Sequence, residues 1–60
     1  MKFRMKIEMD NDAFAEDPRS EMIRILEDVK SNLNESGLEG WVKIVKDING
    51  NTIGRAYISK

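Results

Sequence analysis

The segment Asp47-Ile48-Asn49-Gly50-Asn51 constrains this 60-residue chain more than any other. It lies between two runs, 41–48 and 52–59, that carry apolar residues on both faces of an extended chain. Asparagine, aspartate and glycine in a short stretch between such runs are typical of a β-turn. The sequence therefore predicts a β-hairpin, and the hairpin offers more apolar sheet than one helix can cover.

Two registers of this hairpin compete. A two-residue type I′ loop at Asn49-Gly50 would place Ile48 opposite Asn51. A type I turn that starts at Asp47, with Gly50 in the left-handed region, would place Asp47 opposite Asn51. Aspartate at the first turn position and glycine at the fourth are both favoured, so the sequence favours the second register.

The favoured register sorts the hairpin into two faces. Gly54 and Ala56 are small enough to let a helix approach, so their face is expected to meet the helix, together with Val42, Ile44 and Ile58. On the other face, Trp41 pairs with Tyr57, Lys43 with Arg55, and Val45 with Ile53. These six residues, with Arg4 and Lys6 of the first strand, form the predicted partner-binding face. A purely structural alternative makes Trp41 and Tyr57 a stabilising cross-strand pair. Another makes Trp41, Val45, Ile53 and Tyr57 the core itself.

Residues 2–9 alternate between apolar and charged side chains, which is the pattern of a half-buried strand. Phe3, Met5, Ile7 and Met9 lie on one side, and Lys2, Arg4, Lys6 and Glu8 on the other. The segment Asp10-Asn11-Asp12 favours a turn that ends the strand. Phe14 is expected in a single helical turn at the edge of the core.

Asp17-Pro18 predicts the start of a helix, because aspartate is a good N-cap and proline suits the first helical position. The helix is expected from Pro18 to Ser36, with Gly37 as a left-handed stop. Its apolar stripe, expected to face the sheet, consists of Met22, Leu26, Val29 and Leu33, flanked by Ile23 and Ile25. The acidic residues of the helix are expected on a solvated face.

The order strand, helix, strand, strand predicts one α+β domain over residues 1–60. A right-handed crossover places the first strand beside the last one, which gives a three-stranded antiparallel sheet of order 1-3-2. The helix covers one face of the sheet. The other face is left open.

Composition excludes several kinds of chemistry. The chain has no cysteine and no histidine, so it lacks disulfides, thiolate nucleophiles, imidazole bases and the usual zinc ligands. Residues 47–51 resemble the opening of a calcium loop, but the glycine and the closing glutamate are misplaced. We therefore expect a non-enzymatic protein with no cofactor and no metal site. The alternating start lacks the apolar block of a signal peptide, which favours the cytoplasm.

Charge is unevenly distributed although the net charge is only −1. The predicted strands are mainly basic, and the predicted helix is mainly acidic. Either surface is therefore able to attract a partner of opposite charge.

Three segments carry a resemblance to known proteins: 6–14 (KIEMDNDAF), 21–26 (EMIRIL) and 47–54 (DINGNTIG). They resemble a group of small uncharacterised proteins encoded on phages, plasmids and integrated elements, with a "DNxAF" segment, an acidic helix and a "DxNGNxxG" turn. This chain differs in its longer second strand. The resemblance implies a mobile-element accessory protein. Proteins of that origin include inhibitors of host defence nucleases, among them anti-CRISPR proteins.

We expect the chain to bind another protein through its open sheet face, as an accessory factor that blocks a host enzyme. The alternative is single-stranded nucleic-acid binding through the same basic and aromatic face. Self-association as a homodimer is the third option. No membrane and no small-molecule substrate are expected as partners.

Overall fold

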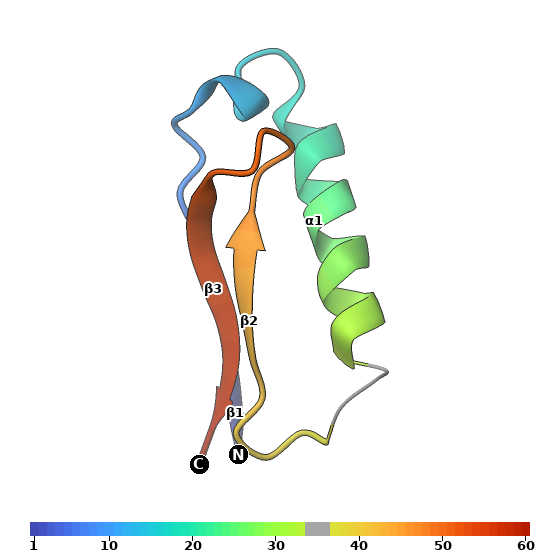
Figure 1. Ribbon diagram of the computed structural model, residues 1–60, viewed down its shortest axis with the longest axis vertical. Coiled ribbons are helices and arrows are strands. Elements are labelled where there is room, and N and C mark those ends of the chain that lie inside the picture. Colours follow the sequence, from blue (N-terminus) through green and yellow to red (C-terminus); the bar gives the residue numbers. More distant parts are fainter. Residues whose placement is uncertain (34–36) are drawn as a thin grey trace.

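The computed structural model describes residues 1–33 and 37–60 and has the expected α+β architecture (Figure 1). Its elements in chain order are β1 (Lys2–Ile7), a 3₁₀ turn (Asp12–Phe14), α1 (Pro18–Leu33), β2 (Val42–Lys46) and β3 (Thr52–Ser59). The three strands form one antiparallel sheet of order β1-β3-β2. The predicted fold class and strand order are confirmed.

The helix begins where the sequence predicts. One carboxylate oxygen of Asp17 accepts a hydrogen bond from the backbone N–H of Ser20 at 3.1 Å, and the other accepts one from the Ser20 hydroxyl at 2.7 Å. This is the N-cap interaction. The described helix ends at Leu33, and the predicted continuation to Ser36 lies outside the described residues.

The hairpin turn adopts the favoured register. The N–H of Gly50 donates to the carbonyl of Asp47 at 3.0 Å, and the N–H of Asp47 donates to the carbonyl of Asn51 at 2.9 Å. Gly50 has a φ of 86°, in the left-handed region that glycine enters without steric cost. The type I turn with Asp47 opposite Asn51 is therefore confirmed.

The register changes one step beyond the turn, through a β-bulge between Val45 and Lys46. Lys46 pairs with Thr52, but Val45 pairs with Gly54, so β3 carries one extra residue here. A slip of one residue exchanges the two faces of a strand. The predicted pairs were wrong for this reason: Tyr57 lies opposite Val42, Arg55 opposite Ile44, and Ala56 opposite Lys43.

The core lies between the sheet and the helix, and it contains Trp41, which is 7% exposed. Its other fully buried apolar members are Phe14, Ile25, Val29, Val45, Ile53 and Ala56. Met5, Ile7 and Ile58 pack against this cluster. The predicted burial of Ala56 and Phe14 is confirmed, whereas Val42 and Ile44 lie on the opposite face of the sheet.

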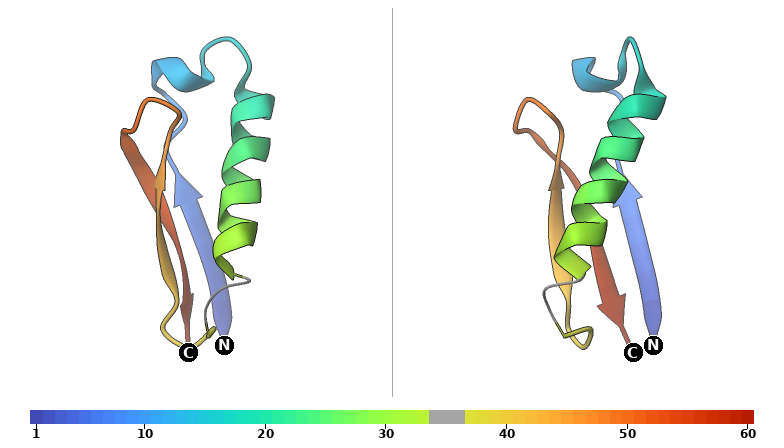
Figure 2. Two further views of the ribbon diagram at one scale, coloured as in Figure 1. Left: turned by 45° about the vertical axis from the view of Figure 1, so that its right-hand side comes forward. Right: turned by 90° about the vertical axis from the view of Figure 1, so that its right-hand side faces the viewer.

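The helix contacts the sheet through Glu21, Ile25 and Val29, which are spaced at four residues and buried. The predicted stripe was wrong by one position at its N-terminal end, since Met22 is 39% exposed and Leu26 is 52% exposed. Figure 2 shows the helix lying obliquely across the sheet, with its last turns over β2 and with β1 at the outer edge. Part of the apolar side of β1 therefore remains accessible.

Gly54 lies at the bulge, in close contact with β1. A Cβ atom built on Gly54 would collide with the carbonyl oxygen of Lys6 and lie 2.8 Å from the Cα of Ile7. Both obstacles are backbone atoms, which cannot move away as a flexible side chain would. Only glycine allows the two strands to pair here.

We predict that Gly54→Ala destabilises the domain by about 3 kcal/mol or more. A domain of this size has a margin of only about 3–5 kcal/mol, so the variant should be largely unfolded. Chemical denaturation followed by circular dichroism measures this. Gly40→Ala is the control, because Gly40 has a positive φ of 74° but open space around it; its cost should be about 1 kcal/mol. Equal losses in the two variants would contradict the close-approach explanation.

Candidate partner-binding face

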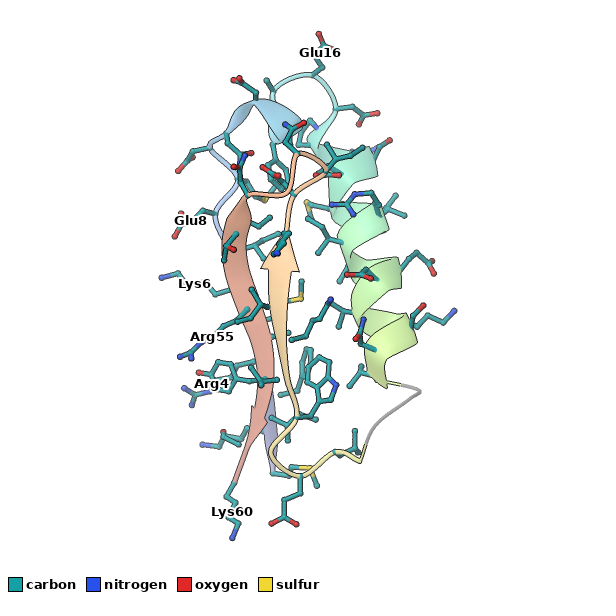
Figure 3. The ribbon with its side chains drawn as sticks, in the orientation of Figure 1. Arg4, Lys6, Glu8, Glu16, Arg55 and Lys60 are labelled. Carbon is teal, nitrogen blue, oxygen red and sulfur yellow. The ribbon has the colours of Figure 1, made fainter. Side chains whose placement is uncertain are left out.

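The open face of the sheet consists of two cross-strand rows. In the first row, Tyr57 on β3 lies between Arg4 on β1 and Val42 on β2. In the second row, Arg55 lies between Lys6 and Ile44. Paired residues point to the same face, so each row has a basic end on β1 and an apolar end on β2. Figure 3 shows Arg4, Lys6 and Arg55 projecting together, away from the helix.

The structure brings together four of the eight predicted site residues on this face: Arg4, Lys6, Arg55 and Tyr57. The other four lie on the helix side, contrary to prediction. Trp41, Val45 and Ile53 are buried in the core, which agrees with the structural alternative for these three residues. Lys43 forms an ion pair with Asp28 of α1, with 3.3 Å between Nζ and Oδ2.

Sequence reasoning missed two apolar members of this face. Val42 is 57% exposed and Ile44 is 50% exposed, although both were expected to contact the helix. Alternation along β2 separates Val42 and Ile44 from Lys43 and Val45, but it does not tell which pair points to the helix. The bulge decides that question.

Two side chains of β3 on this face interact directly. The guanidinium carbon of Arg55 lies 4.7 Å from the centre of the Tyr57 ring, which is a cation–π contact. Beside them lies a shallow depression of about 470 Å³, whose lining includes Lys6, Glu8, Ile44, Arg55 and Tyr57. The face thus presents a charged, aromatic and apolar surface without a deep pocket.

Asp47 has a structural role inside the hairpin turn. It is 4% exposed, and its Oδ1 accepts the backbone N–H groups of Asn49 and Asn51, both at 2.9 Å. Its Oδ2 accepts the side-chain amides of Asn11 at 2.6 Å and Asn51 at 3.2 Å. Burial alone would raise the pKa of Asp47, but the hydrogen bonds from Asn51, Asn49 and Asn11 outweigh it and lower the pKa below 3.8.

Glu21 joins the helix to the same turn. Its carboxylate accepts Nε of Arg24 at 2.7 Å and the backbone N–H of Ile48 at 2.9 Å. Arg24 also donates from Nη2 to the carbonyl of Lys46 at 3.1 Å. The hydrogen bond from Arg24 is the main cause that lowers the pKa of Glu21 below 4.5. The expectation that Glu21 lies on a solvated face was wrong, because it is 6% exposed.

Acidic residues near the 3₁₀ turn do not assemble into a cation site. Among residues 1–33 and 37–60, no three carboxylates gather closely enough to hold a metal ion. The polar side chains of this region serve the turn instead, as the contact between Asn11 and Asp47 shows.

The lowered pKa values predict a loss of stability in acid. Asp47, Glu21 and Asp17 each have a lower pKa in the folded chain, so folding favours their charged forms. Their contribution is present at neutral pH and is lost as the pH falls below about 4.5 and through the folded pKa values. We expect the free energy of unfolding, measured by circular dichroism, to decrease below about pH 4. In the Asp47→Asn variant this decrease with pH should be less steep. An unchanged pH dependence in that variant would contradict the assigned role of Asp47.

We predict opposite effects on stability for substitutions of Trp41 and Tyr57, the two aromatic residues that the predicted register placed opposite each other. Trp41→Ala removes a buried side chain and should cost about 3–5 kcal/mol, enough to unfold the domain. Tyr57→Ala removes a half-buried side chain from the open face and should leave a folded protein. Thermal unfolding measures both. A folded Trp41→Ala variant with nearly unchanged stability would place Trp41 outside the core.

No helix in the described part of the chain has the length and apolar character to cross a membrane. No protein-family model, no curated protein and no solved structure matches this chain.

Proposed function

We propose that this chain is a non-enzymatic protein-binding module whose open sheet face docks on an acidic surface of a partner protein. The observation that carries the proposal is the pair of rows on that face: exposed Val42 and Ile44 lie beside Tyr57 and next to three cations, Arg4, Lys6 and Arg55. Exposed apolar side chains with a charged border are typical of interaction sites.

The composition of the face suits a protein partner. Tyrosine and arginine are enriched in protein interfaces, where they combine large contact area with hydrogen bonding. The cations lie at the β1 side, so they would guide an acidic surface towards Val42 and Ile44. Inhibition of a host defence enzyme, such as a CRISPR nuclease, by a mobile-element accessory protein is consistent with this arrangement, since covering a surface requires no catalytic group.

Single-stranded nucleic acid is the second candidate, supported by the Arg4–Tyr57 row and the neighbouring Lys6 and Arg55. A base stacking near Tyr57 would have Arg4 on the neighbouring strand and Arg55 two residues earlier in β3 for its phosphates. Trp41 lies in the core, however, so of these two aromatic residues Tyr57 alone is able to stack on a base. The protein partner is therefore the preferred reading.

We predict that Ile44→Asp abolishes partner capture. A bacterial lysate is passed over the immobilised protein, with a photo-crosslinking residue at Val42 to mark the contact. The aspartate adds a negative charge at the apolar end of the face, so capture should fall at least about tenfold. Lys30→Glu, on the helix, is the control that should leave capture unchanged.

Two results would argue against the proposal. Capture that is equal for Ile44→Asp and Lys30→Glu would move the binding surface elsewhere. Affinity for an oligothymidylate at low salt, with a salt dependence that flattens in Arg55→Gln, would favour nucleic acid instead.

A further inference from the structure

β1 is an edge strand whose outer side pairs with no described residue. The ladder with β3 continues to Glu8, whose N–H donates to the carbonyl of Ile53 at 2.8 Å. Hydrogen-bonded pairs alternate along an antiparallel ladder, so the even residues of β1 bond to β3. The N–H and C=O groups of Phe3, Met5 and Ile7 therefore point to the free edge, where they are able to pair with another strand.

The charges along this edge are self-complementary. The even positions carry Lys2, Arg4 and Lys6 within β1, and then Glu8 and Asp10 in the segment that directly follows its last residue, Ile7. Figure 3 shows Arg4, Lys6 and Glu8 on the same side of the strand. Basic residues in the first half and acidic residues in the second half match a second copy that runs in the opposite direction.

We infer that a second copy of this chain pairs with β1, antiparallel, about a two-fold axis at Ile7. Ile7 then lies opposite the partner's Ile7, and Met5 lies opposite the partner's Met9. These odd residues are the ones whose backbone groups point to the free edge. On the open face, Lys6 meets the partner's Glu8 and Arg4 meets the partner's Asp10, so every charged pair in residues 4–10 is of opposite sign.

Neighbouring registers lack this match. An axis at Lys6 places two lysines directly opposite each other. An axis at Met5 places Arg4 opposite the partner's Lys6. Like charges directly opposite each other destabilise a strand pair, so the axis at Ile7 is selected.

The helix side of the same edge supplies the apolar contact. A groove of about 220 Å³ runs between β1 and α1 and is lined by Met5, Ile7, Met9, Met22, Ile25 and Leu26. Met9, Met22 and Leu26 are between 37% and 52% exposed. Pairing at β1 brings the two grooves of the dimer together across the two-fold axis and removes these side chains from water. The free backbone groups, the charge pattern and the apolar groove are therefore all matched by the same occupant, a second copy of the chain.

This inference does not depend on the proposed function. The dimer joins two three-stranded sheets into one of six strands and engages Arg4 and Lys6 of each open face. Arg55 and the apolar residues of the face stay accessible to a partner, on the same side of both copies. Val42, Ile44 and Tyr57 lie away from the dimer edge, on β2 and β3.

A charge swap tests both the interface and its register. Sedimentation equilibrium should show a dimer of the unaltered chain. Arg4→Glu and Asp10→Arg should each weaken the dimer by about tenfold or more, because each creates two like-charge pairs in a symmetric dimer. In a mixed dimer of the two variants, both pairs between positions 4 and 10 have opposite charges, so an equimolar mixture should dimerise. The double variant exchanges the two signs but keeps them opposite, so it should regain the original affinity.

Arg55→Glu is the matched control: it reverses one exposed cation on the central strand and should leave the dimer intact.

A second measurement uses the absence of cysteine in the chain. Ile7→Cys should form a disulfide-linked dimer under mild oxidation, because directly opposed residues lie within disulfide reach. Circular dichroism verifies that each variant is folded. A monomer at millimolar concentration, a dimer insensitive to Arg4→Glu, or a groove that binds only a foreign amphipathic helix would overturn the inference.

Discussion

The β-bulge opposite Val45 and Lys46 is the constraint on which the arrangement of this small domain depends. One extra residue in β3 moves Trp41 and Val45 into the core and turns Val42 and Ile44 outwards. The bulge in turn requires Gly54, because a side chain there would collide with the backbone of β1. The pairing of the three strands therefore depends on Gly54, and with it the choice of residues on each face of the sheet.

The fold was predictable from the sequence wherever a pattern was local. The alternation of residues 2–9, the cap at Asp17 and the turn at Asp47 each depend on neighbours within a few positions. The structure confirms the cap and the turn, and it confirms the strand over Lys2–Ile7. The partner-binding face was only half predictable. Arg4, Lys6, Arg55 and Tyr57 lie together on the open face as predicted, whereas Ile53 of β3 is buried in the core. The pairing of β2 depends on a bulge that the turn residues do not indicate, so Val42 and Ile44 were exchanged with Trp41 and Val45.

Two buried carboxylates replace part of the stabilisation that a disulfide would give a chain of this size. Asp47 organises the turn through four hydrogen bonds, and Glu21 links the first turn of the helix to the N–H of Ile48. The sequence indicates the turn position of Asp47, whereas Glu21 was expected on the solvated face of the helix. The burial of Glu21 depends on how the helix and the hairpin pack together, since Glu21 and Ile48 are 27 positions apart. Helix orientation is therefore set by a polar contact as well as by the apolar stripe.

The burial of Trp41 separates two optical signals. This residue is the chain's single tryptophan, and it lies on the helix side near Phe3, with 6.2 Å between the ring centres. The single tyrosine, Tyr57, lies on the opposite face under Arg55. Tryptophan emission consequently reports on the integrity of the core, whereas a partner that docks on the open face as proposed would contact the tyrosine. The two events, loss of structure and occupation of the face, are spectroscopically distinct in the unlabelled protein.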